Sequence, residues 1–268
     1  MRKVIPILLL YIFSVAGCLT LEGQPYALNI LSTPQEIELG EQLAGEIEKQ
    51  ETISDDAVLQ TYITGIGERL ERVATRQDVP YSFTVIDKPD TVNAFALPGG
   101  PMYLYTGLLK MCENEAELAS VMAHEMAHVA AQHHGEAMTK QYGMELLSQL
   151  LLGKNTGAWA SIASDFGKGL MMNYYSRANE READALGMEF LFRAGYQPEA
   201  MVSFMQKLIA EEQRAGGGHP LPIFSSHPPT QERLVRLQNL MQQYPLDVRQ
   251  KAPIYEERYQ ENVLSRLK

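Results

Sequence analysis

The chain has 268 residues, of which 45% are hydrophobic and 21% are charged, and its formal net charge is −10. This length and composition are typical of one large domain or two small ones with a sizeable core. The negative charge argues against nucleic acid as a partner, because phosphate backbones attract basic surfaces.

The N-terminal segment has the pattern of a signal peptide. Two basic residues precede an apolar stretch, 4–15, which is shorter than the roughly 20 residues that a membrane-spanning helix needs. Val15-Ala16-Gly17-Cys18 resembles a lipobox, which predicts cleavage before Cys18 and lipidation of its thiol. An ordinary secretory signal is the alternative. Leu19 follows the cysteine, and the absence of Asp there favours an extracytoplasmic protein anchored in the outer membrane and facing the periplasm. We expect a signal peptide at 1–17, a lipidated tether at 18–32 and a single domain at 33–268.

The first part of the mature chain predicts two helices followed by three strands. Thr33-Pro34-Gln35-Glu36 is a capping-box pattern that starts one helix, and an apolar stripe predicts another at about 56–76. Residues 81–87 alternate in the manner of a strand. Residues 93–105 predict two short strands joined at Pro98-Gly99-Gly100. An edge strand there could add an extended peptide through backbone hydrogen bonds, and a plain hairpin with no substrate role is the alternative.

A metal-binding pattern, His124-Glu125-Met126-Ala127-His128, lies in a predicted helix at about 114–134. Residues four apart share a helix face, so His124 and His128 can bind one zinc ion. Glu125 would then lie beside the metal, where its carboxylate can accept a proton from water. The flanking residues are small and apolar, which predicts a buried helix whose polar groups need partners. A solvated helix with two unrelated histidines is the alternative.

The remaining chain is predicted to be helical. Residues 136–175 are apolar in patches, which predicts a pair of helices over the site, with a membrane-dipping lid as the alternative. Further helices are expected at 176–194, after Pro198, after Thr230 and in the tail from residue 252.

A catalytic zinc site takes three protein ligands and keeps one open position. Two later histidines, His133 and His134, would lie more than about 100° off the ligand face if the helix continues, which predicts surface or supporting roles. The segment 180–184 is a better source, because Glu180 and Asp184 share a helix face. One carboxylate can bind the metal while the other accepts the outer N–H of a ligand histidine. Spacing alone does not decide between them, and a solvated charged face is the alternative.

These motifs together resemble the gluzincins and, among them, peptidase family M48. That family includes HtpX, the CAAX prenyl endopeptidase and bacterial lipoprotein peptidases of the BepA and LoiP kind, and this chain resembles a bacterial lipoprotein member. The matching stretches are 93–100, 107–109, 124–128, 176–177 with 180–184, and 226–229 with Arg233. The resemblance implies an α+β, mainly helical zincin domain with a small antiparallel sheet and one Zn²⁺ per chain.

The resemblance also implies roles for individual residues. Glu180 would be the third metal ligand beside His124 and His128, and Asp184 would support a ligand histidine. His227 would either stabilise the tetrahedral intermediate or occupy the fourth zinc position and keep the enzyme latent, with a structural loop histidine as the alternative. The strand that pairs with substrate would consist of Asn93, Ala94, Phe95 and Ala96.

The function expected from these features is zinc-dependent endopeptidase activity on extended or misfolded envelope proteins. Glu125 would act as the general base, and His227, Tyr174 or Tyr175 would stabilise the oxyanion. The expected partners are unfolded protein substrates and, through the lipid anchor, the membrane. The main alternative is a lipid-anchored assembly factor or chaperone with a largely latent zinc site. A purely structural zinc site is less favoured, because such a site needs no base beside it.

Overall fold

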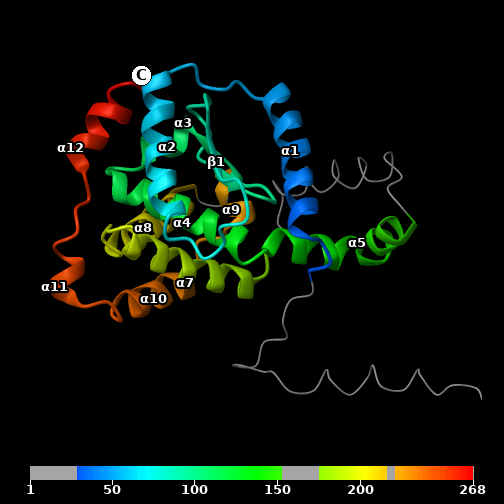
Figure 1. Cartoon of the computed structure of the whole chain (residues 1–268). Helices are drawn as coiled ribbons and strands as arrows, with labels where there is room; N and C mark the ends of the chain where they lie inside the picture. Colours follow the sequence, from blue (N-terminus) through cyan, green and yellow to red (C-terminus); the bar gives the residue numbers. More distant parts are fainter. Residues whose placement is uncertain (1–28, 153–174, 216–220, 268) are drawn as a thin grey trace, which may run out of the picture.

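A computed structural model describes residues 29–152, 175–215 and 221–267 (Figure 1). The predicted signal peptide, Cys18, most of the tether, Tyr174 and much of the 136–175 segment lie outside these residues. The described part is mainly helical with one small sheet, as predicted. Among its helices, none has the length and apolar character required to cross a bilayer.

The sheet contains three strands in the order β1 (Ser82–Ile86), β3 (Pro101–Tyr105) and β2 (Ala94–Ala96). β2 and β3 are the arms of the predicted hairpin and pair antiparallel. β1 pairs with β3 in parallel, so the small sheet is mixed, whereas the family resemblance implied an antiparallel one. The hairpin turn contains Gly99 and Gly100, whose φ angles are 75° and 122°. Glycine adopts this backbone region without a steric penalty, which explains the Gly-Gly pair.

Three helices surround the sheet: α1 (Thr33–Gln50), α2 (Ala57–Glu71) and the short α3 (Thr106–Met111). In Figure 1, α1 and α2 stand on either side of the strands. Ser32 caps α1, and its backbone N–H donates to the Gln35 side chain over 2.8 Å. The predicted capping box therefore begins one residue earlier than expected, and it still fixes the start of the helix.

The helix with the two histidines, α4 (Glu115–Ala130), lies at the centre of the domain. It packs against α2, β2, α7 (Arg177–Arg193) and α8 (Glu199–Ala215), and α10 (Gln231–Met241) covers α7 and α8. Every residue of α4 except the last is buried. Asn114 caps its start, as predicted, by accepting the backbone N–H three residues later over 3.0 Å. This helix is therefore surrounded by the elements that pack against it.

α4 is shorter than predicted. It ends at Ala130 instead of continuing to His134, and Gln132 adopts a left-handed backbone with φ of 58°. A new helix, α5 (His133–Leu152), begins at once and extends away from the domain in Figure 1. Two short helices follow α8 and α10 in the chain, α9 (Pro222–Ser226) and α11 (Leu246–Arg249).

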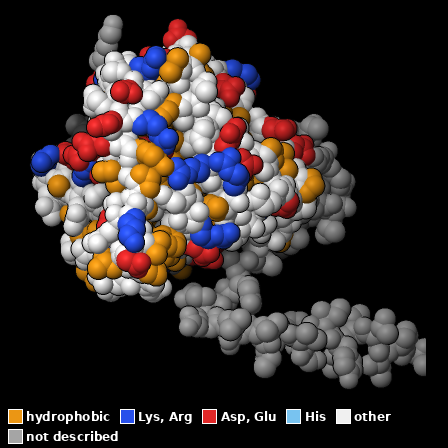
Figure 2. Space-filling view, turned by 60° about the vertical axis from the view of Figure 1, so that its left-hand side comes forward, with side chains coloured by type: hydrophobic (Ala, Val, Ile, Leu, Met, Phe, Trp, Pro, Cys, Tyr) orange, Lys and Arg blue, Asp and Glu red, His pale blue; other side chains and the backbone are white. Residues whose placement is uncertain are grey.

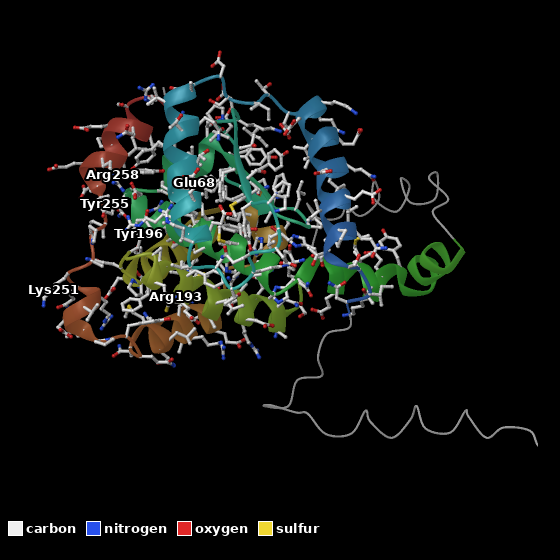
Figure 3. The ribbon with its side chains drawn as sticks, viewed as in Figure 1. Glu68, Arg193, Tyr196, Lys251, Tyr255 and Arg258 are labelled. Atoms are coloured by element: carbon white, nitrogen blue, oxygen red, sulfur yellow. The ribbon has the colours of Figure 1, made fainter. Side chains whose placement is uncertain are left out.

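The C-terminal segment consists of α12 (Glu256–Tyr259) and a π-helical turn (Gln260–Leu264). It is less regular than the single helix predicted, but Tyr259 is buried as expected and donates to a backbone carbonyl of α3 over 2.7 Å. Figure 3 shows Tyr196, Tyr255 and Arg258 side by side here. The buried Glu115 accepts from Tyr196 Oη over 2.6 Å and from Arg258 Nε over 2.7 Å. These bonds tie the end of the chain to the start of α4.

Acidic and basic side chains are interspersed over the face of the molecule shown in Figure 2. Near the middle of that face several basic side chains lie next to one another, with acidic and hydrophobic side chains around them.

Candidate active site

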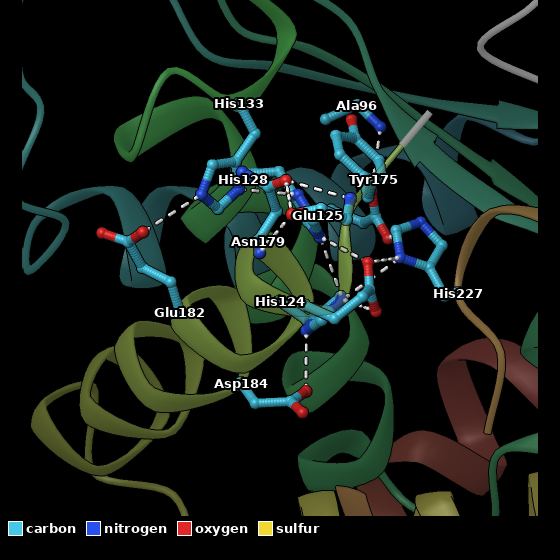
Figure 4. A network of polar contacts seen from close by, with 12 residues as sticks. Ala96, His124, Glu125, His128, His133, Tyr175, Asn179, Glu182, Asp184 and His227 are labelled. Atoms are coloured by element: carbon cyan, nitrogen blue, oxygen red, sulfur yellow. Dashed lines mark hydrogen bonds and ion pairs between the residues drawn. The ribbon is translucent and has the colours of Figure 1, made fainter. Parts of the chain in front are cut away.

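Two histidines of α4 point toward one another from successive turns, as the spacing predicts. The Nε2 atoms of His124 and His128 are 3.2 Å apart, and both rings are buried (Figure 4). Glu125, the residue between them in the motif, is also buried, and it points to the side. A single rigid helix therefore presents two imidazole nitrogens to one point, with a carboxylate next to that point.

The helix α7 brings both predicted carboxylates to the histidines. Glu180 places Oε1 3.4 Å from His128 Nε2 and Oε2 3.5 Å from His124 Nε2. Asp184 lies one turn later, with Oδ1 3.2 Å from Nδ1 of His124. Glu180 therefore faces the inner nitrogens of both rings, whereas Asp184 faces the outer nitrogen of one. The spacing left this choice open; in the structure Glu180 is the carboxylate that faces both inner nitrogens, and its role as a metal ligand stays a prediction.

The close approach of α7 to α4 depends on a glycine. A Cβ atom on Gly187 would lie 3.0 Å from the Cα atom of His124, which is tighter than ordinary packing allows. Sequence reasoning did not single out this residue. A glycine inside a helical pattern is nevertheless a recognisable signal of close packing.

His227 follows α9 and reaches the same point. Its Nδ1 atom lies 3.3 Å from His124 Nε2 and 3.0 Å from Glu180 Oε1, and its Nε2 atom lies 3.2 Å from Glu125 Oε1. Potential ligand atoms of His124, His128, Glu180 and His227 all lie within 4.8 Å of one another. The described chain thus brings together four ligand candidates, one more than a catalytic zinc site needs.

Arg233 of α10 neutralises the carboxylates, and sequence reasoning gave it no role at the site. Its Nη1 atom lies 2.7 Å from Glu180 Oε2, and it binds Asp184 through Nη2 and Nε over 2.7 and 2.9 Å. Burial favours the neutral form of Glu180, but His227 and Arg233 hold its pKa well below the ordinary value. Both carboxylates are therefore ionised, and Arg233 fixes their orientation.

The histidines differ in their charge states when no metal is present. Burial opposes protonation of His124, but its hydrogen bonds to Asp184 and Glu180 raise the pKa to about 9. Burial holds the pKa of His128 well below its ordinary value, so this ring is neutral. The cluster therefore already attracts one positive charge, which is carried by a proton on His124.

These residues fit a zinc ion. Imidazole nitrogen and carboxylate oxygen are the zinc ligands found in hydrolytic sites. Glu180 Oε2 lies 2.7 Å from Arg233 Nη1 and 3.5 Å from His124 Nε2, and a carboxylate oxygen has two lone pairs, so it can also bind a metal. A cation held by these groups would take the place of the proton on His124.

The outer strand β2 lies directly against the site. The backbone N–H of Ala96 donates to Glu125 Oε2 over 3.1 Å, and His134 Nε2 donates to the Ala96 carbonyl over 2.9 Å. The Tyr175 hydroxyl lies 2.7 Å from the same nitrogen of His134. β2 is an edge strand, as predicted, since β3 is its only partner among the strands that the structure describes. In this structure, however, the outward-facing N–H and carbonyl of Ala96 already have side-chain partners.

A pocket opens next to the histidines and Glu125. Its polar lining includes His124, Glu125, Asp184, His227 and Arg233. Its apolar lining comes mainly from α8, through Met201, Phe204, Met205 and Leu208. The site therefore has an apolar surface beside it.

A buried cluster of imidazoles and a carboxylate, with a second carboxylate beside it and an edge strand alongside, defines a zinc metallopeptidase of the gluzincin class. The profile of peptidase family M48 matches residues 57–241, and the chain belongs to this family of zinc-using peptidases.

The chain is similar to the beta-barrel assembly-enhancing protease of Escherichia coli K12, at 32% identity over 85% of this chain and 48% of that protein. A putative beta-barrel assembly-enhancing protease of Vibrio cholerae is 33% identical over 81% of this chain and 46% of its own length. The mitochondrial metalloendopeptidase OMA1 of Schizosaccharomyces pombe is 30% identical, over 66% of this chain and 51% of OMA1. The chain spans about half the length of these relatives.

Proposed function

We propose that this protein is a zinc-dependent endopeptidase that cleaves extended segments of misfolded or immature bacterial envelope proteins. The observation that carries the proposal is the position of Glu125, next to the buried ligand cluster and against the edge strand β2. Membership in peptidase family M48 supports hydrolysis. The names of the relatives in Escherichia coli and Vibrio cholerae, which refer to assembly of β-barrels, support an envelope substrate.

His124, His128 and Glu180 would hold the metal. Bound zinc supplies Lewis acidity, which polarises the scissile carbonyl and acidifies water. Asp184 accepts the outer N–H of His124 and keeps its inner nitrogen free for the metal. Arg233 keeps both carboxylates ionised and in place.

Glu125 is the proposed general base. Its two oxygens are oriented by separate partners, the Ala96 N–H at 3.1 Å and His227 Nε2 at 3.2 Å. It takes a proton from the attacking water and donates that proton to the leaving amine, so that the scissile C–N bond breaks into an acid and an amine. Burial favours the neutral hydroxyl of Tyr175 and raises its pKa well above the ordinary value. This hydroxyl could therefore donate a hydrogen bond to the developing oxyanion.

The substrate would bind as an additional strand on β2, along Asn93, Ala94, Phe95 and Ala96. Recognition of backbone groups in this way selects for an extended conformation more than for a sequence. The apolar lining of the pocket adds one preference, because it favours a substrate residue with a hydrophobic side chain next to the scissile bond.

Cleavage of unfolded casein by the purified protein tests the proposal. Glu125→Gln should retain zinc, measured by elemental analysis, and lose cleavage by at least about 100-fold, because a general base contributes roughly 10²–10⁴-fold. His124→Ala is the matched control, which should lose both zinc and activity. A zinc-loaded Glu125→Gln variant that cleaves casein as fast as the wild type would refute the role of the base.

The position of His227 favours a second candidate, an assembly factor whose zinc site is mostly latent. Its Nδ1 atom lies within the ligand cluster, where it could take the fourth position that a substrate needs. In the alternative role, the His227 ring would move out of the fourth metal position and stabilise the reacting carbonyl. His227→Ala distinguishes the two, because activity gained in the variant supports latency and activity lost supports stabilisation.

The remaining parts of the proposal concern location. We propose that the chain is cleaved before Cys18, lipidated there and held in the outer membrane facing the periplasm. Cys18→Ser should abolish incorporation of radiolabelled palmitate and release the protein from the membrane fraction. Continued membrane sedimentation of an unlabelled protein would contradict this.

A further inference from the structure

The break between α4 and α5 occurs at a residue that disfavours the backbone it adopts. Gln132 has φ of 58°, in the left-handed region that residues with a Cβ atom rarely adopt. The chain turns there, and α5 begins at the next residue, His133. In a continuous helix the His133 ring would point away from the ligand face. Because of the turn it comes back to His128 instead (Figure 4).

The contact between the two rings is specific. Nδ1 of His133 lies 2.9 Å from Nδ1 of His128, and the ring planes are inclined by 70°. His133 is only 2% exposed. The other nitrogen of His128, Nε2, faces His124 and Glu180 within the ligand cluster. One edge of His128 is therefore directed at the site and the opposite edge at His133.

The hydrogen atoms can be placed from this geometry. A neutral imidazole has one N–H and one lone pair, and metal binding through Nε2 requires the proton of His128 to be on Nδ1. This N–H donates to Nδ1 of His133, which must then be an acceptor. The proton of His133 is consequently on Nε2, which lies 3.4 Å from Glu182 Oε2. The three side chains form a row in which each member fixes the tautomer of the next.

From this arrangement we infer that His133 is a positioning residue for the metal ligand His128, and that the left-handed turn at Gln132 brings it there. The inference rests on the zinc site proposed above. It gives each ligand histidine of α4 its own partner, since Asp184 accepts from the outer nitrogen of His124 over 3.2 Å. Groups that bind the outer nitrogen of a ligand histidine typically change metal affinity by 10–100-fold when they are removed.

A pair of nearly isosteric variants tests the role. His133→Leu removes the acceptor, whereas His133→Asn places Oδ1 where Nδ1 was. We expect the full-length leucine variant to bind zinc about 10–100-fold more weakly, measured by competition with a chelator of known affinity. The asparagine variant should retain most of the wild-type affinity. Equal affinities in the two variants, whether both wild-type or both weakened, would overturn the inference.

Stability in the absence of metal separates positioning from a structural role. Thermal unfolding in excess chelator should give similar midpoints for the wild type and both variants. A leucine variant that does not fold without metal would show that His133 is needed for the fold itself, which also overturns the inference. Zinc affinity is measured without any substrate, so a protein that binds zinc as expected but does not cleave casein would contradict only the proposed function.

Discussion

Arg233 provides a test of how charge is balanced at the site. It is 7% exposed and binds two buried carboxylates, Glu180 and Asp184, at distances of 2.7 to 2.9 Å. The variant Arg233→Met keeps a similar length and removes the charge. Removal of one partner from a buried ion pair costs about 3–5 kcal/mol, because the other partner is left buried and uncompensated.

The expected loss depends on metal. In excess chelator the free energy of unfolding of Arg233→Met should fall by about 3–5 kcal/mol. With zinc bound, the charge of Glu180 has another partner, so the loss should be smaller and the stabilisation by zinc should be larger than in the wild type. Urea unfolding followed by circular dichroism, with and without zinc, measures both quantities.

The control for this prediction is a surface arginine. Arg193 pairs with Glu189 on α7 over 3.4 Å, and both side chains are nearly half exposed. Arg193→Met should change stability by no more than about 1 kcal/mol, which is the range for exposed pairs. If Arg233→Met in chelator behaves like this control, Arg233 does not compensate the buried carboxylates and the electrostatic reasoning is wrong.

Three further predictions concern the surroundings of the site. Ala96→Pro removes the backbone N–H that orients Glu125, so kcat should fall about 10-fold or more. The zinc content of this variant should stay at the wild-type level. Ala96→Gly is the control, because it keeps the N–H. Gly187→Ala should lower zinc affinity and cost about 1–3 kcal/mol of stability, because the added methyl would displace the backbone of His124; an unchanged variant would contradict the close packing. Burial lowers the pKa of His134 from 6.5 to about 3. On acidification the unfolded chain therefore takes up this proton at a higher pH than the folded chain does. The stability that the neutral ring contributes above pH 6.5 is lost as the pH falls toward 3. Between pH 7 and pH 5 in chelator, the wild type should therefore lose about 2 kcal/mol more than His134→Gln, measured by urea unfolding, and equal losses would contradict the shift.

The central features of the site could be predicted because they depend on local spacing. His124 and His128 share a helix face by virtue of the four-residue interval, and Asn114 caps that helix as expected. The hairpin at the Gly99-Gly100 turn follows from the backbone freedom of glycine. Glu180 and Asp184 were correctly placed on one face, although only the family resemblance suggested which of them is directed at the inner nitrogens of the histidines.

Other features depend on contacts between distant segments or on an atypical backbone. Gln132 has no sequence signature of a left-handed residue, such as Gly or Asn, so the end of α4 and the return of His133 to the site could not be expected. The parallel pairing of β1 with β3 depends on the path of the chain and not on strand pattern. Arg233 lies 49 residues beyond Asp184, and no local rule joins them.

Anomalous scattering at the zinc edge, from crystals of the purified protein, tests the central claim most directly. The account predicts one peak per chain, in contact with Nε2 of His124, Nε2 of His128 and a carboxylate oxygen of Glu180. A protein that holds no metal after purification in zinc, or a peak from which Glu180 is turned away, would contradict it.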